Sequence, residues 1–482
     1  MTGLGVERRT ASEPAADDAT ERPRHRWATP AAWVVFALCA AYVLISSATH
    51  DFRDEPLAGD TSAHLMQALS VAYDSHSFNF DARDLENWKE LGWAAEPVGM
   101  FFQRYDRDRY GAAKPYGYSL YAGPFIAVFG PVRGIALANT VLLGLMMAIS
   151  IALLRTRFRG PVVPLTVGAF FLASYAYMYA FWIHSELFLG LVSLLALAAA
   201  ARFAQTGKAA WALLAFAVMG FGMSEKAAYL GLFAPIGLVM LWKARSTWLR
   251  IAMPLTALAV FAVAVLPYLR YSDWQSFTPY GGDDRLYVQS ATPFAGGTTG
   301  FASTTFEASS LTTNIRTPVD DKLKAALYTV VGRHTGMLVY LPLALLLIGA
   351  AIARFPRADA WGRAALVSVL GYIAFYAVMF PTNYFGGGQS LGNSYFLQMA
   401  PAILVLPVLM GVSRRVLLGC SLAGAVLGLA LLWPQHMHPR SAHVYIEKTT
   451  AVQRLLPVES NQDTAGYFRC EKRSVGDVTV CE

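Results

Sequence analysis

A single carboxylate stands at the predicted start of a helix, shortly after the first long apolar run. From Asp60 onward, apolar residues over 61–72 recur at helical spacing, which predicts an amphipathic helix lying on a membrane surface. An aspartate in this position commonly caps the helix by accepting backbone hydrogen bonds. Held beside a bilayer, the same carboxylate could instead act as a general base that removes a proton from a hydroxyl group. Asp54, Glu55 and His64 are auxiliary candidates around it.

Three cations stand where they could meet an anionic group. Lys114 opens a short Tyr-rich segment, 114–125, that suits a second interfacial helix, and Lys226 and Arg333 lie at predicted outer ends of spans. Ionisable groups at membrane depth are costly and typical of functional sites, so all three are candidates for binding a phosphate. The alternatives are snorkelling to headgroups, a water-facing turn or a structural ion pair. The other ionisable residues at outer span ends are His184 and Glu186, together with Glu225 and His334, which are further auxiliary candidates.

A glycine-rich loop is the last candidate segment. Residues 383–396 contain three consecutive glycines, which allow close backbone approach to a ligand or simply form a loose turn, and Asn393, a further auxiliary candidate. The chain has no GxxxxGK[ST] pattern, so a nucleotide-driven pump is not expected, and it has no Cys/His spacing typical of a metal site. Participation of a divalent cation, Mg²⁺ or Mn²⁺, stays open. Cys470 and Cys481 could form a structural disulfide.

The elements that must position these residues are transmembrane helices. The 482 residues are 55% hydrophobic and only 15% charged, whereas soluble domains carry about 25% charged residues. Long windows lack charge altogether, and runs of about 17–25 apolar residues are what a hydrocarbon core requires. An all-α polytopic protein with about eleven spans is therefore expected. The predicted spans are 31–48, 134–154, 161–181, 185–203, 209–223, 227–242, 249–267, 327–352, 363–380, 396–411 and 416–432.

Lys and Arg residues are concentrated in every second short loop, which predicts a cytoplasmic N-terminus and a C-terminus on the outer side. Residues 1–30 are expected to form a disordered cytoplasmic tail, and the first apolar run is expected to be a retained helix, because no convincing cleavage site follows it. The transmembrane domain then covers 31–432, with outer loops at 49–133 and 268–326, and 433–482 is a short outer tail.

The net charge of +7 comes with basic cytoplasmic loops that would face anionic lipid headgroups. No basic stripe interleaved with aromatic residues is present, so nucleic-acid binding is not expected. A composition rich in Ala and Arg suggests a bacterial chain, which would place the protein in the plasma (inner) membrane.

The pattern resembles the C-type (GT-C fold) integral-membrane glycosyltransferases, the superfamily of protein O-mannosyltransferases and the lipid A aminoarabinose transferase. The shared features are a long first outer loop with an acidic residue after the first helix, two surface helices and eleven to thirteen spans. The segments that carry the resemblance are 59–60, 77–84, 114–124, 332–342 and 387–397.

The resemblance implies transfer of a hexosyl or pentosyl group from a polyprenyl-phosphate donor to a glycan, lipid or protein acceptor at the outer membrane face. Asp60 would be the general base of a single, inverting displacement. Lys114, Lys226 and Arg333 would stabilise charge developing on the departing lipid phosphate.

The sequence departs from the family pattern in two places. Thr61 stands where members often have a second acidic residue, and Ser394 stands where they often have Arg. Two other classes stay open. An O-antigen polymerase or ligase usually carries its large outer loop late in the chain, and a transporter or lipid flippase places polar sites near the bilayer midplane, often in two related halves. This chain has its longest acidic loop first and no evident halves.

Overall fold

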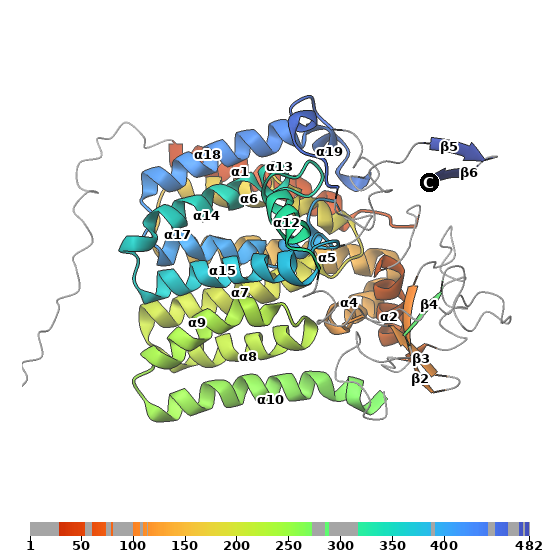
Figure 1. Ribbon diagram of the computed structural model, residues 1–482, viewed down its shortest axis with the longest axis horizontal. Coiled ribbons are helices and arrows are strands. Elements are labelled where there is room, and N and C mark those ends of the chain that lie inside the picture. The colour runs from red at the N-terminus through yellow and green to blue at the C-terminus, as the bar shows by residue number, and fades with distance from the viewer. Residues whose placement is uncertain are drawn as a thin grey trace, which may run out of the picture.

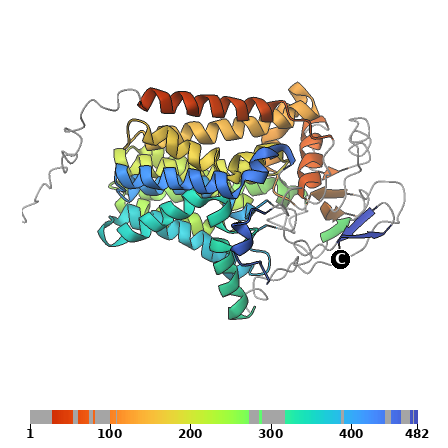
Figure 2. The ribbon, with the colours of Figure 1, turned by 90° about the horizontal axis from the view of Figure 1, so that it is seen from above.

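The computed structural model consists mainly of α-helices that run side by side along the long axis of the molecule (Figure 1). Two helices, α2 (Asp60–Tyr73) and α4 (Gly117–Phe129), lie with the small strands at one end of this bundle in both views (Figures 1 and 2). The structure describes residues 28–53, 60–73, 79–80, 100–106, 109–112, 114–271, 285–288, 317–386, 391–441, 449–460, 472–475 and 478–481.

Within the described residues, six helices are long and apolar enough to cross a membrane, or up to seven spans if a bent pair counts as one. The six are α1 (Ala28–Ala48), α5 (Pro131–Leu154), α7 (Glu186–Thr206), α10 (Thr247–Tyr271), α15 (Ala360–Met379) and α18 (Arg414–Leu431). The bent pair joins α6 (Val162–Phe171) to the 3-10 helix η3 (Tyr175–Phe181) at 57°. Shorter apolar helices are α4, α8 (Ala209–Glu225), α9 (Tyr229–Lys243) and the segment Ala400–Leu409. The helical, polytopic architecture is confirmed, and the count of about eleven spans stays a prediction.

The outer helices of the bundle present apolar side chains to their surroundings. Leu38 of α1 is 67% exposed and Leu258 of α10 is 62% exposed, as expected of helices that face lipid. Between helices, lipid provides no hydrophobic driving force, so close packing depends on small residues. At Gly220 of α8, an added Cβ would overlap the carbonyl of Ala257 in α10, so these two helices meet backbone to backbone.

Besides the span 161–181, which is the bent pair of α6 and η3, two further predicted spans are not single helices. The predicted span 327–352 is broken into α12 (Val319–Val331), α13 (Met337–Tyr340) and α14 (Pro342–Arg354), and Figure 2 shows α12 projecting from the bundle. Pro342 lacks the N–H that would continue a helix into α14. The predicted span 396–411 consists of α16 (Ser394–Leu397), the 3-10 helix η5 (Ala400–Val405) and α17 (Leu406–Leu409), with Pro401 and Pro407 near the starts of the last two.

Strands that the all-helical prediction did not include lie at the α2 end of the bundle. A four-stranded antiparallel sheet has the order β1-β3-β2-β4, and a hairpin pairs β5 with β6. The strands are β1 (Asn79–Phe80), β2 (Met100–Asp106), β3 (Arg109–Ala112), β4 (Arg285–Val288), β5 (Lys472–Val475) and β6 (Val478–Cys481). Because β4 follows α10, the sheet joins the two predicted outer loops. The remaining short helices are η4 (Phe355–Arg357), α19 (Trp433–Met437), η6 (Pro439–Ser441) and η7 (Gln453–Leu455).

The helix predicted to begin at Asp60 is confirmed, but it does not lie on an open surface. Every residue from Thr61 to Val71 is buried. α2 packs against α4 and contacts β1, β2 and β3. The helix is therefore the buried centre of the group of elements, α4 and the four-stranded sheet, at this end of the bundle. The second predicted surface helix, α4, is also present and exposes Leu120 and Val128.

Candidate functional site

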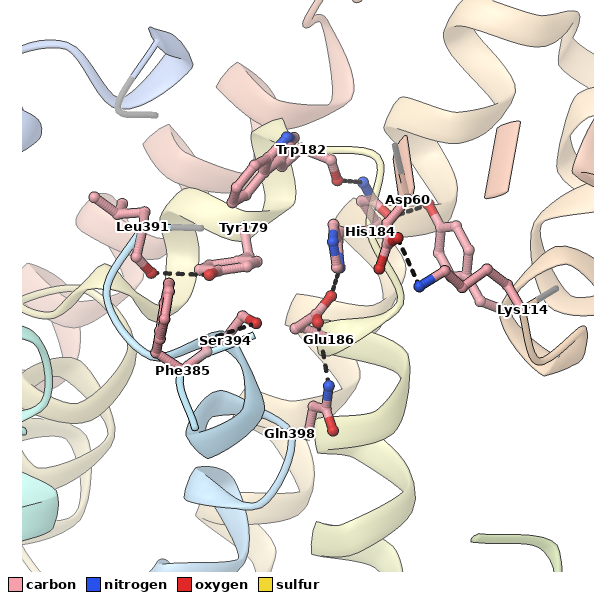
Figure 3. Close-up of polar contacts among 12 residues, drawn as sticks. Asp60, Lys114, Tyr179, Trp182, His184, Glu186, Phe385, Leu391, Ser394 and Gln398 are labelled. Carbon is pink, nitrogen blue, oxygen red and sulfur yellow. Dashed lines mark hydrogen bonds and ion pairs between the residues drawn. The ribbon is translucent and has the colours of Figure 1, made fainter. Parts of the chain in front are cut away.

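Asp60 and Lys114 form an ion pair at the end of the bundle (Figure 3). Lys114 Nζ lies 2.6 Å from Asp60 Oδ1, and the two side chains are 13% and 31% exposed. Asp60 is the first residue of α2, and Lys114 precedes α4 by three residues. The structure therefore brings together the predicted base and one of the three predicted phosphate-binding cations.

The position of Lys114 is fixed by hydrogen bonds around the start of α4. Its carbonyl accepts from Gln67 Nε2 of α2 at 3.4 Å, and the backbone N–H of Tyr116 donates to the hydroxyl of Tyr268 in α10 at 2.8 Å. Glu225, at the end of α8, accepts a hydrogen bond from the backbone N–H of Gly117. A carboxyl oxygen at this position satisfies a backbone donor that the first turn of a helix leaves unpaired. Burial raises the pKa of Glu225 to about 8, so the group is mostly uncharged at neutral pH. Glu225, a predicted auxiliary residue, is thus the cap of α4.

The Lys114 ammonium controls the charge of Asp60. Burial raises the pKa of Asp60, but the charge and hydrogen bond of Lys114, together with electrostatic interactions with His184 and His64, hold the pKa well below the ordinary range of an aspartate. Asp60 is therefore ionised at neutral pH. While it is paired with Lys114 it is a weak base, because proton affinity falls with pKa.

Two buried imidazoles lie beside this pair. The rings of His64 in α2 and His184, in the turn between η3 and α7, have centroids 5.9 Å apart. Burial lowers the pKa of His64 to about 3 and that of His184 to about 4, so both rings are uncharged at neutral pH. Both also interact electrostatically with Asp60. The predicted auxiliary residue His64 thus lies in the same cluster as Asp60.

His184 is held by a carboxylate. Nδ1 of His184 contacts Oε2 of Glu186, the first residue of α7. Oε1 of the same carboxylate accepts from Nε2 of Gln398 at 3.1 Å, and Gln398 Oε1 accepts from the hydroxyl of Tyr372 at 3.2 Å. Figure 3 shows His184, Glu186 and Gln398 in a line that leads away from Asp60. A Glu186–Lys226 ion pair, one structural alternative for these two charges, is absent among the described contacts. Sequence reasoning missed Gln398, a neutral residue with no motif around it.

Lys226 lies over an aromatic ring in the turn between α8 and α9. Its Nζ is 4.3 Å from the centroid of Tyr395, which stacks on Tyr376 at 4.5 Å. Burial, reinforced by the Lys114 charge, lowers the pKa of Lys226 to about 7, although Asp60 partly opposes this shift. The second predicted phosphate-binding cation is therefore electrostatically coupled to the Asp60–Lys114 pair and is only partly charged at neutral pH.

The glycine-rich loop is held against η3 rather than left as a loose turn. Tyr175 donates to the carbonyl of Asn393 at 2.7 Å, and Tyr179 donates to the carbonyl of Leu391 at 2.8 Å. Gly392 has φ +66°, a left-handed conformation that favours glycine. The side chain of Asn393 accepts from the backbone N–H of Phe396 and caps α16. Residues 387–390 of this loop lie outside the described part of the chain.

Arg333 lies in a different cluster. Its guanidinium donates to the carbonyls of Arg454 and Leu456 in the C-terminal segment 449–460. Glu459 of that segment accepts from the backbone N–H groups of His334 and Thr335, each at 2.9 Å. The hydrogen bonds of Arg333 thus fasten the tail to the turn between α12 and α13, and its role as a phosphate ligand stays a prediction.

Two predicted auxiliary residues, Asp54 and Glu55, lie outside the described residues, as does Cys470, the proposed partner of Cys481. Within the part of the chain that the structure describes, no group of three or more His, Cys, Asp or Glu side chains is placed to hold a metal ion. Two carboxylates of the cluster are engaged by other groups: Asp60 pairs with Lys114, and Glu186 contacts His184 and Gln398.

Comparison with protein-family models, with curated proteins and with solved structures gives no match for this chain. The case for a function therefore depends on the chemistry of the cluster itself.

Proposed function

We propose that the protein is a membrane glycosyltransferase that moves a sugar from a polyprenyl-phosphate donor to an acceptor hydroxyl, with Asp60 as general base. The observation that carries this proposal is the Asp60–Lys114 ion pair, a partly exposed carboxylate joined at 2.6 Å to an ammonium at one end of a bundle of apolar helices. Such a pair suits two ligand groups, a phosphate monoanion and a hydroxyl. The ammonium would attract the phosphate, and the carboxylate would accept a hydrogen bond from the hydroxyl.

Donor binding would activate the base. A phosphate that enters the cluster competes with Asp60 for Lys114, because an ammonium is a mobile point charge on a flexible stem. As Lys114 moves to the phosphate, Asp60 loses the partner that depresses its pKa, while its burial, which raises the pKa, remains. Proton affinity therefore increases at Asp60 only when the donor is in place.

The transfer itself is one displacement. The acceptor oxygen attacks the anomeric carbon and loses its proton to Asp60, the bond between that carbon and the phosphate oxygen breaks, and the polyprenyl phosphate leaves with the electron pair. Attack opposite the leaving group inverts the anomeric centre. Lys114 and Lys226 face the growing negative charge, and stabilisation of charge that develops in the transition state commonly contributes more to catalysis than any other effect.

A divalent cation, which some members of the resembled family use, stays an open prediction. The steps above are derived from the side chains of this chain alone. Asp54 and Glu55, outside the described residues, are the carboxylates to test first as metal ligands if chelation with EDTA abolishes transfer.

The setting follows from the sequence. With the N-terminus in the cytoplasm, as the distribution of Lys and Arg predicts, Asp60 and Lys114 act on the outer face of a bacterial inner membrane. A polyprenyl-phosphate sugar reaches that face from within the bilayer, and a membrane lipid, a glycan or a protein hydroxyl serves as acceptor.

The test is transfer of labelled sugar in proteoliposomes supplied with a panel of undecaprenyl-phosphate monosaccharides. Wild-type protein should transfer one of them, and Asp60→Asn, which keeps the shape but not the base, should lower the rate by about 10²–10⁴-fold. Asp51→Asn is the matched control, since Asp51 is an outer-segment carboxylate in an exposed pair with Arg53. Wild-type activity in Asp60→Asn would remove Asp60 from the mechanism. Sugar-lipid movement across the bilayer without transfer would replace the enzyme by a flippase, and transfer that depends on Arg333 but not on Asp60 would favour a polymerase or ligase.

A further inference from the structure

The His184–Glu186 contact is built into the end of the bundle but has no part in the steps above. Both atoms of the contact, His184 Nδ1 and Glu186 Oε2, are buried, and neither has another partner among the described residues. Because the ring is uncharged at neutral pH and an unprotonated nitrogen would be repelled by the anion, the proton of the ring belongs on Nδ1, facing the carboxylate. A neutral imidazole that donates through one nitrogen keeps a lone pair on the other.

The carboxylate is aimed at His184 by a network of neutral donors. Gln398 donates from Nε2 to Glu186 Oε1, and its Oε1 accepts from Tyr372, which fixes the orientation of the amide. The backbone carbonyl of Gln398 accepts from Tyr229 at 3.1 Å. Gln398, between α16 and η5 and itself held by Tyr372 of α15 and Tyr229 of α9, thus engages one oxygen of the carboxylate and leaves the other for the imidazole. A buried carboxylate is costly unless it is hydrogen-bonded, and this one is placed where it orients a histidine.

The second ring nitrogen of His184 is not engaged by the carboxylate. Nε2 makes no hydrogen bond with any described residue and keeps a little exposed surface in a side chain that is otherwise buried. Figure 3 shows His184 between Glu186 and the Asp60–Lys114 pair. A carboxylate that holds the proton of a histidine on Nδ1 fixes the tautomer of the ring. The lone pair is then on Nε2, which can accept a proton.

We infer that His184, positioned by Glu186 and Gln398, is a second proton-transfer residue that receives at Nε2 the proton taken from the acceptor hydroxyl by Asp60. This inference rests on the proposed function. The proton leaves the acceptor oxygen for Asp60, moves from Asp60 to His184, and passes from His184 to the departing phosphate. That phosphate changes from a diester to a monoester and so gains an oxygen that binds a proton with a pKa of about 6.

The order of proton affinities drives the relay in this direction. When the phosphate leaves and Lys114 returns to Asp60, the pKa of Asp60 falls well below that of His184, which is lowered by burial to about 4. The imidazole in turn binds a proton less tightly than the monoester does, so each step is downhill. The titratable and charged groups that face or interact with His184 are Asp60, His64, Lys114, Tyr179, Glu186 and Lys226.

The first test compares His184→Gln and Glu186→Gln with wild type in the transfer assay. Loss of general acid–base help predicts a fall in kcat of about 10²-fold for His184→Gln, with KM nearly unchanged. His436→Gln is the control, because His436 is a half-buried histidine at this end, hydrogen-bonded through Nδ1 to the hydroxyl of Tyr177, and it should retain wild-type kcat.

A structural role for His184 is separated from proton transfer by chemical rescue. In His184→Gly, added imidazole should restore activity, whereas 1,2,4-triazole, which has nearly the same shape but is far less basic, should not. Equal rescue by both, or wild-type kcat in His184→Gln alongside inactive Asp60→Asn, overturns the inference and leaves the proposed function standing. A wild-type protein that transfers no sugar removes the proposed function, and this inference with it.

A measurement without substrate tests the His184–Glu186 contact alone. In protein labelled with ¹⁵N-histidine, the His184 signals, assigned by their loss in His184→Gln, should show a neutral ring protonated at Nδ1 at pH 7. Glu186→Gln should change this tautomer balance. Unchanged ¹⁵N shifts in Glu186→Gln would show that the carboxylate does not orient the ring and would overturn the role given to Glu186.

Discussion

Replacement of Gly117 by alanine should loosen the start of α4 and displace the segment that carries Lys114. A Cβ at this position would lie 2.7 Å from Cδ and Oε1 of Glu225 and 2.8 Å from Oε2, closer than these atoms can approach. The carboxylate must therefore withdraw from the backbone N–H group that it now accepts from.

The expected change in the free energy of unfolding follows from the interactions that the substitution removes and adds. Because burial raises the pKa of Glu225 to about 8, the group is mostly uncharged at neutral pH and adds little to the helix dipole. Loss of its hydrogen bond leaves the buried N–H of Gly117 unsatisfied, which costs about 1–3 kcal/mol. Against this stands a gain of up to about 1 kcal/mol from replacing glycine by alanine in a helix. The net destabilisation of Gly117→Ala should be about 1–2 kcal/mol. Because Lys114 lies three residues before Gly117, the transfer rate should fall as well.

The assay is thermal or denaturant unfolding of purified protein in micelles, followed by tryptophan fluorescence. Gly349→Ala in α14 is the control, because an added Cβ there meets nothing within 4 Å, so this variant should be as stable as wild type or slightly more. The double variant Gly117→Ala with Glu225→Asp, which shortens the carboxylate arm by one carbon, should recover part of the loss. Equal stability of Gly117→Ala and Gly349→Ala would refute the assignment of Glu225 as the cap of α4.

Three further outcomes are expected. Burial lowers the pKa of Lys226 to about 7, so Lys226 loses its charge as pH rises through that value. The affinity of wild type for a polyprenyl phosphodiester, which is monoanionic at every pH tested, should therefore weaken above pH 7. The affinity of Lys226→Arg should not weaken, since arginine stays charged. Arg333→Gln should increase hydrogen–deuterium exchange of the segment 449–460, to whose carbonyls Arg333 donates; unchanged exchange with lost donor affinity would make Arg333 a phosphate ligand instead. Gly220→Ala should push α8 from α10, because its Cβ would overlap the carbonyl of Ala257, and lower the unfolding temperature; an unchanged temperature would show that these helices can separate freely.

Hydropathy predicted the bundle well where the signal is a long uninterrupted run. The helices around 134–154, 185–203 and 249–267 are continuous, because nothing in them removes a backbone hydrogen bond over that length except the prolines that α10 tolerates. The same signal failed at 327–352 and 396–411. There the apolar composition continues through turns that Gly332, Gly336 and the prolines create, and composition alone does not distinguish a broken span from a straight one.

Asp60 and Lys114 could be predicted as site residues from the sequence, but the residues that position the side chains of the cluster could not. Asp60 and Lys114 could be chosen because each is an isolated charge next to an apolar helix. Charge alone could not separate Glu225, which caps α4, or Arg333, which holds the tail, from a substrate ligand, since the same residue types do both. Gln398 carries no charge and lies 212 residues from Glu186 in the chain, so only the fold could bring the two together.

The charges of the cluster are arranged so that their burial destabilises the folded protein little when no ligand is bound. Asp60 and Lys114 cancel each other, His64 and His184 are uncharged, and the partial neutralisation of Lys226 avoids a full buried cation. An uncompensated charge in such surroundings costs several kcal/mol, about as much as a typical domain can spare. Under the proposed function, an arriving phosphate would draw Lys114 from Asp60, favour the charged form of Lys226 and leave Asp60 as a buried carboxylate without its partner. A carboxylate in that state gains by accepting a proton. The ion pair that stabilises the empty site would therefore, once broken by the donor phosphate, leave Asp60 as the stronger base that the proposed transfer requires.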